Sequence, residues 1–254
     1  YSYMGPIDTT QLEGRQTSHL VQLFGFGWFI IGYLAQMILW LLTTLYAIIP
    51  NYGIICILFA FLIRLFTGPL TKQSFLSNQK LQKIQPKIKK IQEKYKADQT
   101  KLSQATMELY KKEGVNPIGG CLPILIQMPL LIALFQVFRK TIEFRGAEFL
   151  PFWITDLSQP DIIIQFAFLK NIPGISYFFG HGIALLPIIM GVVMFLSMKT
   201  TATSTEPSQK FAMYFMNAFF VLLFNTFPSG LNLYYTIYNI LNFIQQHKLK
   251  QLQI

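Results

Sequence analysis

The chain has 254 residues, of which 52% are hydrophobic, 15% are aromatic and only 13% are charged. Soluble domains carry about 25% charged residues, so this composition and the mean hydropathy of +0.41 exclude an ordinary soluble domain and predict a membrane protein. The net charge of +10 could suggest a nucleic-acid partner. Because most of that charge falls in one segment, we expect no direct contact with nucleic acid.

The N-terminal part of the chain divides into two segments. Residues 1–17 are polar and mixed, and they predict no fold of their own. Residues 18–45 combine apolar residues with Trp28, Tyr33 and Trp40, which favours an amphipathic interfacial helix on the outer surface of the membrane. A sixth spanning helix is the alternative, but it would turn the N-terminus inside, against the charge distribution. The chain begins Tyr-Ser-Tyr without a basic leader, so we expect it to be a piece of a longer protein.

Five apolar stretches are long enough to cross a bilayer as helices that satisfy their own backbone hydrogen bonds. They cover residues 46–71, 119–138, 181–198, 211–227 and 231–247. The run Phe227-Pro-Ser-Gly230 predicts a tight turn between the last two stretches. Residues 199–210 are typical of a polar connector. The predicted fold is therefore an all-α membrane protein with five transmembrane helices.

Charge is distributed unevenly between the connecting segments. Residues 72–115 carry eleven lysines against four acidic residues, whereas the charges of residues 139–180 cancel. The positive-inside rule therefore places residues 72–115 and the C-terminus in the cytoplasm and residues 139–180 outside. Apolar residues recur at helical spacing on both sides of Asp98, which predicts a helical hairpin. Its lysines could face anionic headgroups or dock cytosolic partners, two compatible roles, and the candidates are Lys83, Lys87, Lys89, Lys90 and Lys94.

Arg64 lies within the first apolar stretch, where an arginine costs about 2.5–3.5 kcal/mol at the centre of a spanning helix. Snorkelling of the side chain to the headgroups is one explanation. Thr71, at the end of the stretch, is roughly 10 Å away along a helix, so a hydrated and functional arginine is favoured. No aspartate or glutamate lies in any of the five stretches to neutralise it.

Other polar residues also lie in these stretches, and each is by itself more typical of helix-to-helix hydrogen bonding than of a site. Together with an unpaired arginine they predict a wet cavity. A proton- or sodium-coupled transporter would usually place a carboxylate in such a cavity, so its absence disfavours that class. The candidate groove residues are Arg64, Gln127, Asn217, Asn225 and Asn239.

The sequence predicts no cofactor, metal or catalytic site. Gly114 to Gly119 has the glycine spacing of a phosphate loop but lacks the lysine and hydroxyl that would follow. The three histidines are His19, His181 and His247. None has a cysteine or carboxylate at the spacing of metal ligands. Ser229 and His181 could serve as nucleophile and base of an intramembrane protease. However, no oxyanion-hole signature accompanies them, and serine after proline in a turn is routine.

Several motifs from about residue 20 to the end form a specific pattern. Arg64 is followed by Pro69-Leu-Thr-Lys72 and then by Gln85-Pro-Lys-Ile88. Later blocks are Val115-Asn-Pro-Ile-Gly-Gly-Cys-Leu-Pro123, Gln127-Met-Pro129 and Phe227-Pro-Ser-Gly-Leu231. With these blocks the chain resembles the YidC membrane protein insertases.

The resemblance implies a five-helix core around a hydrophilic groove that is open to cytoplasm and lipid, in the bacterial inner membrane. It implies insertion of nascent membrane proteins without enzymatic catalysis, with Arg64 as the groove arginine and residues 1–17 as the end of a periplasmic domain. It also suggests the Sec translocon, the ribosome and signal-recognition machinery as partners. The ending at Ile254, without the long basic tail of some members, leaves direct ribosome binding open. A channel or small-solute transporter is the alternative function.

Overall fold

The computed structural model describes residues 29–96, 98–116, 119, 122–166, 182–201 and 207–251. The predicted tail 1–17, residues 18–28 of the predicted interfacial helix, and the side chains of His19, His181 and Cys121 lie outside this description. The described part is mostly helical, which confirms the helical class. Its helices are α3 (Phe29–Tyr46), α4 (Tyr52–Lys94), α5 (Gln99–Lys112), α6 (Leu122–Lys140), the 3-10 turn η3 (Ile142–Phe144), α8 (Leu185–Thr201), α9 (Pro207–Phe224) and α10 (Ser229–Gln251).

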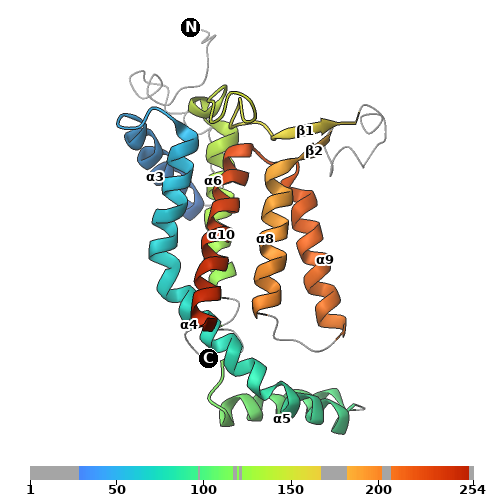
Figure 1. Ribbon diagram of the computed structural model, residues 1–254. Helices are drawn as coiled ribbons and strands as arrows, with labels where there is room; N and C mark the ends of the chain where they lie inside the picture. The colour runs from blue at the N-terminus through green and yellow to red at the C-terminus, as the bar shows by residue number, and fades with distance from the viewer. Residues whose placement is uncertain are drawn as a thin grey trace.

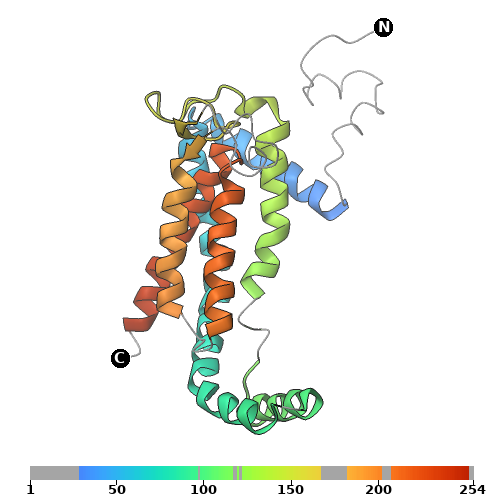
Figure 2. The ribbon, with the colours of Figure 1, turned by 90° about the vertical axis from the view of Figure 1, so that its right-hand side faces the viewer.

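Helices α4, α6, α8, α9 and α10 run lengthwise through the molecule as one bundle (Figure 1; Figure 2). Helix α10 packs mainly against α8 and α4, whereas α9 packs substantially only against α8. Buried residues from all five of these helices meet in one core, among them Phe59, Leu134, Met190, Phe224 and Tyr234. We call the end of the bundle that carries α5 the hairpin end, and the end that carries the two strands the far end (Figure 1).

Helix α4 continues from Tyr52 to Lys94 through the boundary that the sequence predicted between a span and a cytoplasmic helix at residues 71 and 72. Pro69 and Pro86 lie inside it. Each proline removes one backbone donor, but the helix persists on both sides. The predicted boundary marks the passage from membrane to cytoplasm and stays a prediction, because a helix satisfies its own backbone groups in hydrocarbon and in water alike and a change of medium does not end it.

At the hairpin end, the last turns of α4 and helix α5 form a helical hairpin with its own small core. Ile84 and Ile88 of α4 are buried against Val115, with Leu109 of α5 packed on them. Asp98 caps α5 by accepting a hydrogen bond from the backbone N–H of Lys101 at 3.0 Å. The hairpin is thus a projection of α4, so its position is tied to the helix that carries Arg64.

The all-α prediction is wrong for part of residues 139–184. Strands β1 (Ile162–Gln165) and β2 (Gly182–Ala184) form a two-stranded antiparallel sheet at the far end. The isoleucines of β1 are β-branched and favour extended backbone. A Cβ on Gly182 would overlap the carbonyl oxygen of Ile164, so only glycine fits this pairing. The predicted span 181–198 consequently begins as a strand and becomes helical only at Leu185.

Helix α3 lies obliquely at the far end and packs against α6 and α4 (Figure 2). Ala35, Ile38 and Leu42 are buried in this contact, while Tyr33 and Trp40 are exposed. The exposed side also carries the apolar side chain of Met37, so both sides of α3 are largely apolar, and its interfacial placement stays a prediction.

By length and hydropathy, α4 is the one helix in the described part that qualifies by itself as a membrane span. The apolar segments Ile31–Tyr46, Leu185–Thr200 and Lys210–Phe224 are shorter. The number of spanning helices therefore remains a prediction.

Candidate functional site

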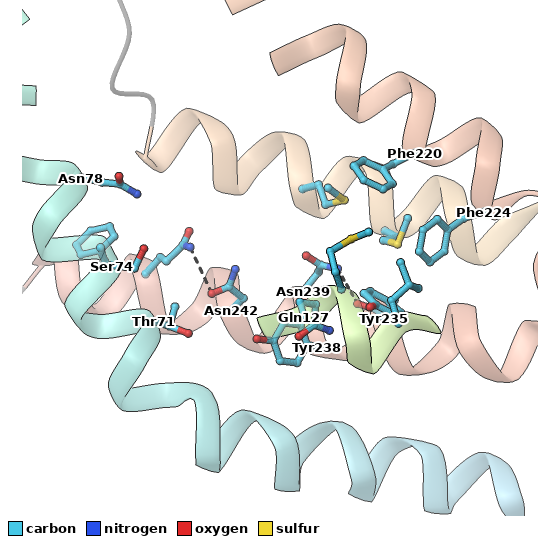
Figure 3. Close-up of a pocket in the computed structure, with 16 residues that line it drawn as sticks. Thr71, Ser74, Asn78, Gln127, Phe220, Phe224, Tyr235, Tyr238, Asn239 and Asn242 are labelled. Carbon is cyan, nitrogen blue, oxygen red and sulfur yellow. Dashed lines mark hydrogen bonds between the residues drawn. The ribbon is translucent and has the colours of Figure 1, made fainter. Parts of the chain in front are cut away.

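A cavity of about 320 Å³ lies between α4, α6, α8, α9 and α10 (Figure 3). Its two walls differ in chemistry. Helices α4 and α10 contribute mostly polar residues, and helices α8 and α9 contribute methionines and phenylalanines. The lining residues are Thr71, Ser74, Phe75 and Asn78 of α4, Gln127, Met128 and Leu131 of α6, Met190 and Met194 of α8, Phe220 and Phe224 of α9, and Tyr235, Tyr238, Asn239, Asn242 and Gln246 of α10.

The polar wall follows from helical spacing along α10. Tyr235, Tyr238, Asn239 and Asn242 are three or four residues apart, and residues with this spacing share one face of a helix. Asn239 donates to the carbonyl of Tyr235 at 2.8 Å, and Gln246 donates to Asn242 at 3.3 Å. These bonds hold the amides along the cavity wall (Figure 3).

Arg64 lies directly behind this wall and is only 8% exposed. Its guanidinium donates to Thr71 Oγ1 at 3.2 Å and to the side-chain oxygen of Gln245. It also lies 5.6 Å from the centre of the Tyr238 ring. Gln245 in turn donates to the carbonyl of Gly68 at 3.1 Å, which fixes its orientation.

All the polar partners of Arg64 within the described residues are neutral. No carboxylate there forms an ion pair with it, and its Nε has no hydrogen-bond partner in the same part of the chain. Thr71 and Tyr238 contact Arg64 and also line the cavity. Arg64 itself does not line the cavity: its guanidinium is held directly behind the wall, with no carboxylate of the described residues paired to it.

Two of the other four predicted groove residues reach the cavity. Gln127 and Asn239 line it, and Gln127 approaches the hydroxyl of Tyr234 at 3.4 Å. Because Gln127 lies on α6 and Asn239 on α10, the cavity has amides on two facing helices.

The remaining two predicted residues lie elsewhere, and neither lines the cavity. Asn217 is buried between α9 and α8, where it donates to the carbonyl of Gly191 at 3.3 Å. Asn225 lies at the far end, where it accepts from the N–H of Ala184 and donates to the carbonyl of Gly182, both at 2.8 Å. Both asparagines join helices or strands, which is the structural role that isolated polar residues in apolar helices most often have.

The profile of the family described as 60Kd inner membrane protein matches residues 44–254. The chain belongs to this family. Relatives named membrane protein insertase YidC include those of Chlorobium luteolum and Pelodictyon phaeoclathratiforme, each 42% identical over 96% of this chain and 41% of the relative. That of Prosthecochloris aestuarii is 43% identical over the same shares. The chain thus spans about two fifths of the length of these relatives.

A crystal structure described as an active YidC insertase with the first transmembrane domain resolved has the same fold. It superposes on this chain with a TM-score of 0.63, at 27% sequence identity, and the match covers 95% of this chain and 53% of the other. The helical architecture around the cavity is therefore shared with a solved relative.

In this member of the 60Kd inner membrane protein family, the cavity extends toward the hairpin end. A smaller cavity of about 170 Å³ shares Phe75 and Asn78 with the first one. Lys199 and Lys250 also line it. The polar wall therefore leads toward a basic rim at the hairpin end.

Contacts at the far end close the bundle on that side. The turn between α9 and α10 is bonded to the preceding loop through the N–H groups of Ser229 and Gly230, which donate to the carbonyls of Gln159 at 2.7 Å and Leu157 at 3.0 Å. Asp161 accepts from the N–H groups of Leu185 and Leu186 at the start of α8, at 3.0 and 2.8 Å. Burial raises the pKa of the Asp161 carboxyl, and the hydrogen bond from Leu186 partly opposes that effect.

Ser229 does not have the surroundings of a nucleophile. It is fully buried, and its hydroxyl donates to the carbonyl of Asp156 at 3.0 Å. Its proposed base, His181, lies outside the described residues. The hydroxyl of Ser229 therefore bonds the turn between α9 and α10 to the loop that contains Asp156.

Sequence reasoning missed three polar lining residues of α4, namely Thr71, Ser74 and Asn78. They follow Arg64 at helical spacing, so the signal was present. They were missed because the span was expected to end at Thr71.

The five predicted hairpin lysines lie on the outer side of the α4–α5 hairpin. Lys83, Lys87, Lys90 and Lys94 are exposed and Lys89 is half-buried. The four exposed ones are three or four residues apart and therefore form one stripe along α4. Lys87 is also 2.6 Å from Glu113. Most of this stripe is accessible to a partner.

Proposed function

We propose that this chain is the insertase core of a multi-pass protein of the bacterial inner membrane, and that it moves short polar segments of nascent membrane proteins outward without enzymatic catalysis. The single observation that carries this proposal is an amphipathic cavity with an arginine directly behind its polar wall, bonded only to neutral partners. The family match and the relatives named membrane protein insertase YidC support the same function.

The proposed orientation puts the hairpin end and the C-terminus in the cytoplasm and the far end outside. The stripe of exposed lysines on α4 and the basic residues Lys248 and Lys250 in the last turn of α10 support this orientation through the positive-inside rule. In this arrangement α4, α6, α8, α9 and α10 each cross the membrane, and α3 lies on the outer surface.

The cavity lowers the barrier for a polar segment by shortening the dry distance. In hydrocarbon each unpaired backbone group costs several kcal/mol, and the amides of Gln127, Asn239 and Asn242 offer hydrogen bonds part-way across. The short helix α8 next to the cavity also shortens the dry distance. It has only 17 residues, whereas about 20 are needed for an untilted span.

Arg64 attracts acidic residues of the passing segment. Because its partners Thr71, Gln245 and Tyr238 are neutral, an incoming carboxylate meets a charge that is not already paired. A membrane potential that is negative inside then favours outward movement of that carboxylate by about 2.3 kcal/mol per charge per 100 mV.

The apolar helix of the substrate leaves sideways between α6 and α9. In the described part these two helices make almost no direct contact, and they present Met128, Leu131 and Phe220 to the cavity. A polar segment can therefore occupy the amide wall while its apolar continuation faces lipid.

The lysine stripe on α4 serves as the docking surface for cytosolic partners, with the ribosome, signal-recognition machinery and the Sec translocon as candidates. Its charge also draws the hairpin toward anionic headgroups, by about 1 kcal/mol per lysine near the surface.

The deciding experiment compares Arg64→Ala and Arg64→Lys in the complete protein, reconstituted in vesicles with a single-span substrate whose outer segment is acidic. We expect insertion to fall at least severalfold in the alanine variant and to be largely retained with lysine. Unchanged insertion in Arg64→Ala would refute the role of the charge. Solute flux through the same vesicles would instead identify a channel or transporter.

A further inference from the structure

A second cavity, of about 750 Å³, lies at the far end, outside the site described above. It is bounded by the last turns of α6 and α9, by Arg145, and by the loop of residues 156–160. The pocket is open to the surface of the molecule, and its lining combines charged and apolar side chains.

The polar side of this far-end cavity carries two guanidinium groups, those of Arg139 and Arg145. Both side chains are exposed, and no carboxylate within the described ranges lies within ion-pairing distance of either. The carboxylate of Asp156 also lines the cavity, but it accepts from the N–H and hydroxyl of Ser158 at 2.8 and 2.7 Å. The lining therefore has a net charge of +1.

The apolar part of the far-end cavity lining is formed by Phe135, Leu223 and Phe227. The guanidinium of Arg139 lies over the Phe135 ring at 5.4 Å, and the rings of Phe135 and Phe227 are 4.8 Å apart. Phe135 belongs to α6, and Phe227 follows the end of α9, so the two sides of the bundle meet at this aromatic pair. The apolar side chains form a wall next to the two guanidinium groups.

We propose that this cavity binds the headgroup of an anionic glycerophospholipid, of the phosphatidylglycerol class, from the outer leaflet. The two arginines bind the phosphodiester, which carries one negative charge and matches the net charge of the lining. The acyl chains pass over Phe135 and Phe227. This inference rests on the membrane orientation of the proposed function, but it does not require insertase activity.

The geometry favours a lipid over an acidic peptide for two reasons. Arginine forms bidentate hydrogen bonds with phosphate oxygens, and cationic residues at span ends commonly lie at headgroup depth. In addition, a bound peptide would leave the apolar wall uncovered, whereas a lipid covers both the charged and the apolar side.

The test measures lipid retention by native mass spectrometry of the complete protein extracted from bilayers that contain phosphatidylglycerol and phosphatidylethanolamine. We expect the wild type to retain phosphatidylglycerol preferentially. In Arg139→Gln/Arg145→Gln we expect this retention to fall by at least about tenfold, because the loss of even one hydrogen bond to a charged group has an effect of this size. Lys111→Gln/Lys112→Gln removes the same charge from exposed positions of α5 and should retain the lipid.

Arg139→Lys/Arg145→Lys changes the same two positions but keeps their charge. It should therefore retain more lipid than the glutamine variant, which distinguishes loss of lipid recognition from misfolding. Equal retention in the wild type and the glutamine variant would overturn the proposal. So would displacement of the lipid by millimolar inorganic phosphate or glycerol phosphate, or binding of an acidic peptide in its place. The lipid measurement contains no substrate protein. Its result is therefore independent of whether Arg64→Ala changes insertion.

Discussion

At the scale of single residues, the protein keeps a buried positive charge without neutralising it. Arg64 is bonded to Thr71 and Gln245 and lies against the Tyr238 ring. A carboxylate in any of these places would form an ion pair and remove the attraction for an incoming acidic residue. Neutral donors and acceptors instead hold the guanidinium in place while its charge remains available.

Gln245→Glu should therefore impair insertion even though Arg64 is intact. Hydrogen bonds to charged groups contribute about 1.5–3 kcal/mol, so we expect roughly a tenfold loss in insertion rate for a substrate with an acidic outer segment, measured in vesicles. Gln251→Glu is the matched control, because it adds the same charge to α10 at an exposed side chain outside the cavity. Equal losses in both variants would contradict specific pairing with Arg64.

Two aspartates should give opposite pH dependences of stability. Burial raises the pKa of Asp161, so its contribution to stability is full below the unfolded value of about 3.9 and is lost as pH rises through its higher folded pKa. The hydrogen bond from the N–H of Lys101 lowers the pKa of Asp98. That contribution is present above the unfolded pKa and is lost as pH falls through the folded one.

Thermal unfolding of the detergent-solubilised protein between pH 3 and pH 7 would check both signs. Asp161→Asn keeps an acceptor oxygen for Leu185 and Leu186, so it should become more stable than the wild type as pH rises. Asp98→Asn should lose stability relative to the wild type over the same range. The same sign for both variants would be incompatible with the burial of Asp161.

At the scale of elements, α4 and the pair α8–α9 determine the shape of the site. Because α4 is continuous from Tyr52 to Lys94, one helix carries Arg64, the polar lining residue Thr71 and the first half of the hairpin. Helix α9 is held to the bundle through α8, and this contact is close. A Cβ on Gly191 would overlap Cγ2 of Val221, and such close approach through a small residue is typical of helix pairs in membranes.

Gly191→Ala should therefore destabilise the protein, and Val221→Ala should restore it. Overpacking a filled contact costs about 1–3 kcal/mol, so we expect a lower melting temperature for the single variant Gly191→Ala. In the double variant the alanine methyl occupies the space left by the valine, and the two effects should be strongly non-additive. Additive effects in this double-mutant cycle would contradict the contact.

At the scale of the whole molecule, the two ends of the bundle differ. At the far end, backbone bonds from Ser229 and Gly230 and the cap by Asp161 join the loops to the helices. Toward the hairpin end the cavity continues to Lys199 and Lys250. Between α6 and α9 direct contacts are almost absent in the described part. The arrangement is suited to accept a segment from one end and release it sideways.

A photoreactive amino acid at Met128 of α6 or Phe220 of α9 should cross-link to the apolar helix of an inserting substrate. Both positions line the cavity. The control position is Phe66, which is 74% exposed and lies on the opposite face of α4 from Arg64, about 200° around the helix. Equal cross-linking at Phe66 would rule out release between α6 and α9. The yield at all three positions is measured by gel analysis of a labelled substrate.

Much of this arrangement could be predicted from sequence because the relevant forces are local. Apolar composition sets which segments are helical, and the lysines of α4 and α5 are segregated from the balanced residues 139–180. The error in the predicted fold has a longer-range cause. Strands β1 and β2 were missed because their pairing depends on Ile162–Gln165 meeting residues some twenty positions later, with a glycine at position 182.

By itself, the sequence determined the membrane class, the helical segments, the cost of Arg64 and the absence of a carboxylate to neutralise it, since each depends on composition along one stretch of chain. Only the tertiary structure decided which polar residues share the cavity. It turned Gln127 and Asn239 inward, used Asn217 and Asn225 to join other elements, and brought Gln245 to Arg64 from 181 residues away. The physical reason is that the rotation of each helix about its axis is set by packing against all its neighbours at once, which no single helix encodes.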